Sequence, residues 1–252
     1  MSPYFLLYGL KKLCFCDIIL LTISKAAIFM KRTKLIDRLL PSYTNGEEIF
    51  NMVTHIVGGG LGVVYLVLCV IVAALHGNVW GVVSSAIYGA SVISLFTMSS
   101  IYHGVKPGMA KKVLQVLDHC TIYFMIAGTY TPLMLSMFRK TNPVMAWVIF
   151  GVVWGMAALA ITLTAIDLKK YKIFSMISYI GMGWCVIVTI VPVYHALTFW
   201  GFFWLLGGGI MYTIGAILFE LGEKIRYMHS IFHIFVVLAS LMHFICILFF
   251  AL

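Results

Sequence analysis

The chain has 252 residues, of which 63% are hydrophobic and only 10% are charged, and its formal net charge is +9. Soluble domains carry roughly a quarter charged residues and about half apolar ones, so this composition excludes an ordinary soluble protein and indicates a polytopic membrane protein. A positive charge can also indicate nucleic-acid binding, but these basic residues are spread between apolar segments, as is typical of membrane topology. We therefore expect membrane lipids, and no nucleic acid, as partners.

The N-terminal region differs from the rest of the chain. Residues 13–29 are apolar but are interrupted by Asp17 and Lys25, which favours a helix lying in the membrane interface over an additional span. A start of translation at Met30 is a third interpretation. We expect residues 1–46 to form a cytoplasmic or interfacial extension and residues 47–252 to form the transmembrane domain.

Beyond this extension the sequence alternates between long apolar segments and short polar separators. Each segment is close to the ~20 residues that a helix needs to cross a bilayer, and the separators contain turn residues or charges. The pattern predicts an all-α fold, a bundle of seven transmembrane helices. The segments are 51–75, 80–103, 113–136, 143–165, 173–194, 198–219 and 229–251.

The distribution of basic residues predicts the orientation of this bundle. Of the 17 lysines and arginines, only Arg139 and Lys140 fall in loops on the side opposite the N-terminus. Basic residues stay on the cytoplasmic side, so we expect the N-terminus in the cytoplasm and the C-terminus outside. The short loops suggest a multi-pass protein of a bacterial plasma membrane.

Three polar patterns stand out against the apolar background. Ser99 and His103 are four residues apart in "SSIYH", Asp118 lies in "LDHC", and His229 and His233 are four residues apart in "HSIFH". Residues four apart share one face of a helix, about 6 Å apart along its axis. The predicted topology places all three patterns near the cytoplasmic ends of their helices, so they can meet at one depth.

Three neutral imidazoles with a fourth position open are a common form of catalytic zinc site, and such a site activates water for hydrolysis. We therefore predict that His103, His229 and His233 bind Zn²⁺. Asp118 is expected to accept a proton or orient a histidine, and Ser99 to hydrogen-bond water or a substrate oxygen. The alternative is that these histidines form interhelical hydrogen bonds and that Asp118 pairs with a loop lysine such as Lys111.

The remaining polar residues of the spans are assigned structural roles. His243 lies deeper than the pair and off its face, His119 faces away from Asp118, and His55 stands alone, so we interpret all three as packing or hydrogen-bonding residues. Glu47 and Glu48 follow a turn and suit the first turn of a helix, where negative charge is favourable.

The motifs "GEEIFNMVTHIVGGGLG", "SSIYHGV", "VLQVLDHCTIYFMIAGTYTPLML" and "HSIFHIFVVLASLMHF" resemble the hemolysin III family. That family is grouped with the progestin and adipoQ receptors, including the adiponectin receptors, and more distantly with alkaline ceramidases. The resemblance covers roughly residues 45–252 and implies a seven-helix bundle with zinc near the cytoplasmic face. By motif position it implies His103, His229 and His233 as ligands, with Asp118 and Ser99 beside the metal.

These observations favour a zinc-dependent hydrolase of lipid amide or ester bonds. Relatives with known chemistry are amide hydrolases, and the predicted site keeps an open position on the metal. One alternative is a cytolysin, although a permanently hydrophobic chain differs from pore-forming proteins that are secreted in soluble form. The other is a membrane-homeostasis sensor with structural zinc, which a tightly held Asp118 carboxylate would favour. The sequence does not distinguish these functions.

Overall fold

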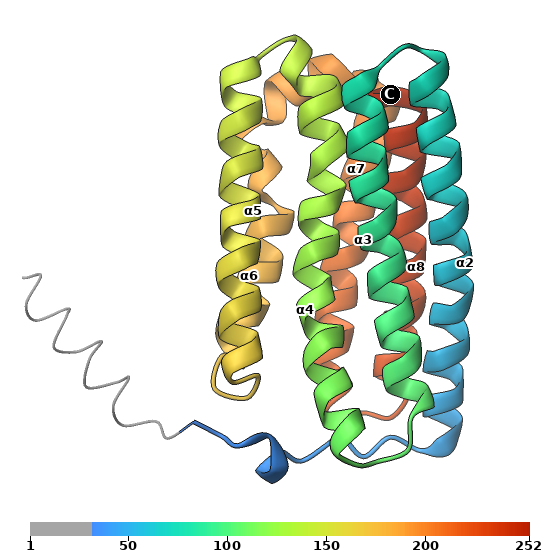
Figure 1. Ribbon diagram of the computed structural model, residues 1–252, viewed down its shortest axis with the longest axis vertical. Helices are drawn as coiled ribbons and strands as arrows, with labels where there is room; N and C mark the ends of the chain where they lie inside the picture. The colour runs from blue at the N-terminus through green and yellow to red at the C-terminus, as the bar shows by residue number, and fades with distance from the viewer. Residues whose placement is uncertain (1–31) are drawn as a thin grey trace, which may run out of the picture. The chain divides into compact units, whose positions relative to one another are not determined.

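The computed structural model describes residues 32–252, and most of these residues lie in long helices that stand side by side (Figure 1). The helix and extra span considered for residues 13–29, and the start considered at Met30, lie outside the described residues. Short 3-10 or π-helical turns lie at 35–37, 133–137, 138–140, 185–189 and 247–251. The α-helices are α2 (Asn45–Leu75), α3 (Val79–Gly104), α4 (Met109–Pro132), α5 (Pro143–Ile166), α6 (Lys172–Gly183), α7 (Ile190–Leu221) and α8 (Met228–Cys246).

Polar residues at the helix starts explain where several helices begin. Thr44 and Glu47 form a capping box at the start of α2, in which each side chain binds the other residue's backbone N–H. The Asn78 side chain accepts from Gly81 N at the start of α3, and Asn142 accepts from Met145 N at the start of α5. These contacts satisfy backbone donors that a helix leaves unpaired, so the loops between the helices can be short.

Glycines allow the helices that carry the site to approach each other closely. A Cβ atom added at Gly58 of α2 would lie 2.6 Å from the Phe96 ring of α3, and one added at Gly128 of α4 would lie 2.1 Å from Ser91 Oγ of α3. Small residues at helix contacts bring backbones together, which stabilises packing in a membrane. Helices α2, α3 and α4 are therefore held in close contact.

Six stretches of the described chain are long and apolar enough to cross a membrane. Together with the relatives described below, they identify a multi-pass membrane protein whose described part is all-helical, as the sequence predicts. The predicted segments 80–103 and 143–165 nearly coincide with α3 and α5. The predicted segments 173–194 and 198–219, in contrast, fall within one 50-residue stretch, Lys172–Leu221.

The predicted segment 173–194 is helical but not one continuous α-helix, and a second irregularity lies in the separator predicted between it and 198–219. Helix α6 ends at Gly183 and a short 3-10 turn follows before α7 begins at Ile190. The Tyr130 hydroxyl of α4 donates to Gly183 O and accepts from Val186 N, both at 2.9 Å. Within α7, Thr198 has φ 63° and ψ 176°, which interrupts the helix again. A tertiary contact therefore stabilises the first break.

The loops that join α3 to α4, α5 to α6 and α7 to α8 lie at one end of the bundle (Figure 1). The segment that precedes α2 lies at the same end, and the loops that join α2 to α3 and α4 to α5 lie at the other. The grouping of the basic loops at one end agrees with the alternation read from the sequence. The C-terminal end of α3 and the N-terminal ends of α4 and α8 meet here.

Candidate metal centre

Three histidines from two helices converge at this end of the bundle. His103 lies in the last turn of α3, and His229 and His233 lie in the first turns of α8. All three are buried, and one ring nitrogen from each lies within 4.8 Å of the others. Nε2 of His229 lies 3.1 Å from Nε2 of His233. The structure thus brings together the three residues predicted to bind a metal.

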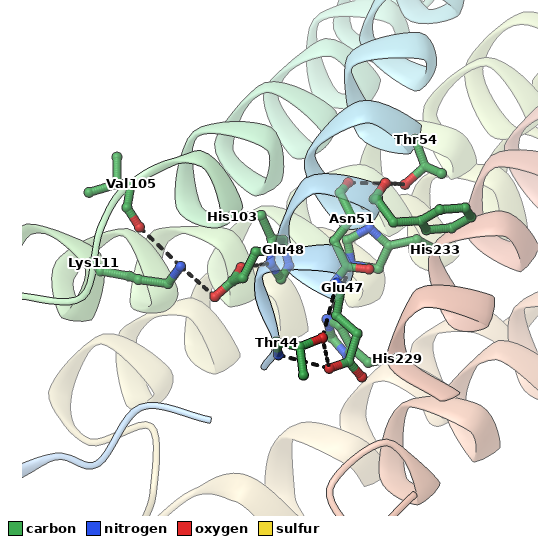
Figure 2. A network of polar contacts seen from close by, with 11 residues as sticks. Thr44, Glu47, Glu48, Asn51, Thr54, His103, Val105, Lys111, His229 and His233 are labelled. Atoms are coloured by element: carbon green, nitrogen blue, oxygen red, sulfur yellow. Dashed lines mark hydrogen bonds and ion pairs between the residues drawn. The ribbon is translucent and has the colours of Figure 1, made fainter. Parts of the chain in front are cut away.

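A carboxylate contacts one ring nitrogen of His103. Its Nδ1 lies 2.7 Å from Glu48 Oε2, and the other Glu48 oxygen accepts from Lys111 Nζ at 2.6 Å (Figure 2). Lys111 Nζ also donates to Val105 O at the end of α3. The Nε2 atom of His103 is buried and has no hydrogen-bond partner within the described part of the chain. His103 therefore offers Nε2 as a free nitrogen.

This arrangement confirms one expectation from the sequence and corrects an alternative. Glu47 and Glu48 both lie in the first turn of α2, as expected, although only Glu47 joins the capping box. Lys111, considered as a partner of Asp118, is paired with Glu48 instead. The two glutamates lie on different sides of the helix, so one of them stabilises the helix start and the other contacts a histidine.

Two aromatic rings pack on the histidine pair. Tyr43, which precedes α2, stacks on His229 with ring centroids 4.9 Å apart, and burial raises the pKa of the Tyr43 hydroxyl above its usual range. His55 of α2 stacks on His233 with centroids 3.7 Å apart. Both ring nitrogens of His55 are buried without a hydrogen-bond partner among residues 32–252. The expectation that His55 stands alone is wrong, because it packs on the candidate metal centre itself.

Asp118 and Ser99 lie beside this cluster. Both line the cavity that His229 and His233 also line. A carboxylate and a hydroxyl next to imidazoles can hold or transfer a proton during a reaction. The sequence-predicted site residues therefore occupy one region of the molecule.

The cavity has a volume of about 140 Å³ and is lined mainly by apolar side chains of α4, α6, α7 and α8. It extends from the histidine pair to His243 on the same helix, ten residues and about 15 Å further along α8. His243 is hydrogen-bonded to Leu205 O at 3.1 Å, and His119 to Gln115 O at 2.7 Å. Both histidines thus make the hydrogen bonds that a structural role predicts, but both also line the cavity, so His119 does not face away from Asp118 as expected.

The donor set suits a metal that prefers imidazole. A tetrahedral site with zinc–nitrogen bonds near 2.0–2.1 Å separates its nitrogens by about 3.4 Å, close to the 3.1 Å between the His229 and His233 nitrogens. One ring nitrogen of His103 lies within 4.8 Å of the ligand atoms of the other two histidines. Imidazole nitrogens also bind copper, iron and nickel. The three histidines could therefore hold a metal ion, and the geometry leaves its identity open.

The sequence contains a weak signal for the residues near the histidines that the sequence analysis did not assign to the site. Glu48, Asn51 and His55 recur at intervals of three and four along the start of α2, so they share one side of an otherwise apolar helix. Ionisable residues on one face of a membrane helix mark functional sites. That periodicity indicates a third helix at the site. Tyr43 precedes the first predicted span, so no periodicity could reveal it.

Comparison with known proteins identifies a family that matches this chain. A family model described as haemolysin-III related matches residues 43–244. The chain is 39% identical to Hemolysin-3 of Bacillus cereus over 206 residues, which cover 82% of this chain and 92% of that protein. It is 36% identical to the Hemolysin-3 homolog of Bacillus subtilis over 208 residues, 82% of this chain and 96% of that protein.

A more distant similarity extends to animals. The monocyte to macrophage differentiation factor of Homo sapiens is 29% identical over 183 residues, which cover 69% of this chain and 72% of that protein. The matched family region, residues 43–244, contains Tyr43, Glu48 and the three histidines of the cluster. The chain belongs to the haemolysin-III related family.

Proposed function

We propose that this protein is a zinc-dependent hydrolase that cleaves an amide or ester bond of a membrane lipid near the cytoplasmic face of the bilayer. One observation carries the proposal: three buried imidazoles converge, and those of His229 and His233 line an apolar cavity that Asp118 and Ser99 also line. An apolar cavity with a few convergent polar groups is the usual form of a ligand site. In a membrane protein, the available apolar ligands are lipids.

The residues of the site divide the chemistry between them. A zinc ion held by the three imidazoles would polarise a carbonyl oxygen and lower the pKa of a water molecule. The Asp118 carboxylate accepts the proton of the attacking water and returns it to the leaving group. Ser99 donates a hydrogen bond to the substrate oxygen that gains negative charge. The apolar side chains of α4, α6, α7 and α8 receive the acyl chain and keep it away from water.

The proposal includes a topology. Residues 172–221 contain two spans that meet at Thr198, and the first of them is interrupted after Gly183, which gives seven spans over residues 47–252. Residues 1–46 form an extension on the cytoplasmic side, and the C-terminus lies outside. This orientation puts the histidine cluster at the inner leaflet, because the cluster lies at the same end as the basic loops.

Asp118→Asn tests the catalytic assignment, because it keeps the size of the side chain but removes the proton acceptor. The detergent-purified chain is incubated with a panel of acyl-amide and acyl-ester lipids, with and without a chelator. We expect a chelator-sensitive product, and a fall in rate of at least about 100-fold in Asp118→Asn with zinc content unchanged. Glu223→Gln, an exposed residue that pairs with Lys172, is the control. The absence of any metal-dependent product, or full activity of Asp118→Asn, contradicts the proposal.

A second candidate is a membrane-active cytolysin, which the name of the Bacillus cereus relative favours. Purified protein and the His233→Ala variant are compared for lysis of erythrocytes at equal concentration. Lysis by both proteins would support a cytolysin that works without the metal. Lysis by the wild type alone would link it to the centre, and the products formed from the erythrocyte lipids would then identify the chemistry.

A third candidate is a membrane-homeostasis sensor in which zinc is structural. The packing of Tyr43 on His229 and of His55 on His233 favours it, because these rings cover two sides of the cluster. The lipid panel distinguishes it from the hydrolase. A sensor retains one zinc per chain and yields no product, and loss of zinc lowers its thermal stability.

A further inference from the structure

Glu48 uses both of its carboxylate oxygens, one on each of two other helices. Oε2 lies 2.7 Å from Nδ1 of His103 on α3, and Oε1 lies 2.6 Å from Nζ of Lys111 on α4. The His103 and Lys111 side chains are 0% and 3% exposed, and that of Glu48 is 17% exposed. Charge-assisted hydrogen bonds of this length are stronger than neutral ones. The contact is therefore a rigid part of the site.

Capping does not account for Glu48. Glu47 accepts from Thr44 N at 2.8 Å and from Tyr227 N at 2.8 Å, so it stabilises the start of α2 and ties it to the start of α8. Glu48, one residue further along, points about 100° away around the helix. The Glu47 carboxylate thus accepts hydrogen bonds from the backbone, and the Glu48 carboxylate contacts a side chain of the candidate metal centre.

The contact determines which nitrogen of His103 carries hydrogen. An ionised carboxylate can only accept a hydrogen bond, so Nδ1 carries hydrogen, and in the neutral ring Nε2 then keeps its lone pair. That Nε2 atom is buried and has no hydrogen-bond partner in the described chain. A histidine ring that is free to rotate and change tautomer would offer this lone pair only part of the time.

We infer that Glu48 is a positioning residue of the metal centre: it holds His103 in the tautomer and orientation that present Nε2 to a metal. Carboxylates behind ligating histidines fix the ring and raise its basicity, and their loss typically costs 10–100-fold in metal affinity. The inference rests on the metal centre of the proposed function. It does not depend on which reaction, if any, that centre performs.

Lys111 completes the arrangement. Its Nζ donates to Glu48 and to Val105 O, the first residue after α3, and it lies 5.1 Å from the centre of the Tyr102 ring. It therefore fixes Glu48 and the end of α3 that carries His103 at the same time. The positive charge of Lys111 also offsets the negative charge of the Glu48 carboxylate. This pairing lowers the free-energy cost of a half-buried charge beside apolar helices.

Two measurements on detergent-purified full-length protein test this inference. The first is Zn²⁺ affinity by competition with a chromophoric chelator. We expect Glu48→Ala to bind Zn²⁺ about 10–100-fold more weakly than the wild type. Glu48→Gln should fall between them, because its amide oxygen still accepts from Nδ1 but carries no charge. Glu223→Ala, which removes an exposed carboxylate paired with Lys172, should match the wild type.

The second measurement is the tautomer of His103 in the metal-free protein, read from the ¹⁵N shifts of labelled histidines and assigned with His103→Gln. We expect Nδ1–H in the wild type and in Glu48→Gln, and a mixture in Glu48→Ala. This readout needs neither metal nor substrate, so it separates the inference from a failure of the hydrolase proposal. Wild-type affinity and an unchanged tautomer in Glu48→Ala would overturn it. If that variant does not fold, wild-type affinity in Glu48→Gln would do so.

Discussion

Polar side chains inside a membrane protein are costly unless they are paired or bind a ligand. At the start of α2, Glu47 binds the backbone ahead of α8 and Glu48 binds His103. His55, about two turns further along the helix, has no such partner for its ring nitrogens among residues 32–252 and instead stacks on His233. The start of α2 therefore acts as the common support for both helices that carry the candidate ligands.

His55→Phe tests whether this neighbour supports the cluster or takes part in it. Phe keeps a flat ring for stacking on His233 and removes two buried nitrogens without hydrogen-bond partners in the described chain. Because an unsatisfied buried group costs about 1–3 kcal/mol, we expect unchanged zinc content and equal or higher thermal stability. Loss of zinc in this variant, measured by elemental analysis, would make His55 a ligand. His233→Phe is the matched variant that should lose zinc.

At the residue scale, the sequence could predict His103, His229 and His233. Spacing by four places residues on one helix face, and the alternation of basic loops places these faces at one depth. It could not assign Glu48, because a glutamate in a first turn is equally compatible with capping. Which of two adjacent carboxylates caps the helix, and which reaches another helix, depends on where α3 and α4 pack.

At the element scale, local signals fixed most helix ends. The predicted segment 80–103 and the observed α3 differ by one residue at each end, because Asn78 caps the helix and an apolar run follows it. The break after Gly183 could not be predicted in this way. At this break, Gly183 O and Val186 N form hydrogen bonds with the Tyr130 hydroxyl, which lies 53 and 56 residues away in the chain. A local pattern contains no information about such a partner.

Removing this hydroxyl should destabilise the break. Tyr130→Phe leaves Gly183 O and Val186 N without their tertiary partner, and each lost hydrogen bond costs about 0.5–1.5 kcal/mol. We expect a loss of roughly 2 kcal/mol in the free energy of unfolding, measured in detergent by denaturant titration. Tyr194→Phe, at a residue that is 40% exposed, should change stability little. Equal stability of both variants would show that the break does not depend on Tyr130.

At the scale of the whole molecule, the basic loops and the histidine cluster share one end of the bundle (Figure 1). Positive loops remain in the cytoplasm, so the orientation of the chain also decides on which side of the membrane the centre lies. The sequence predicts this orientation from charge alone, since the loop lysines need no tertiary partner to act as topology signals. The position of the cluster relative to the loops required the packed bundle.

Cysteine labelling with a membrane-impermeant thiol reagent tests the orientation in intact cells. His76→Cys lies in the turn between α2 and α3, and Lys106→Cys lies in the loop between α3 and α4. We expect labelling of the first from outside and of the second only after permeabilisation. The wild type is the control, since its described cysteines are buried or partly buried. The reverse pattern would place the histidine cluster at the outer face.

The most direct test of the account is the metal content of the detergent-purified full chain, with and without each histidine. We predict one zinc ion per chain in the wild type and its loss in His103→Ala, His229→Ala and His233→Ala. His243→Ala, which removes a buried histidine that is bonded to Leu205 O in the same cavity, should retain it. A wild-type protein without stoichiometric metal, or equal loss of metal in all four variants, would contradict the assignment of these three residues as ligands.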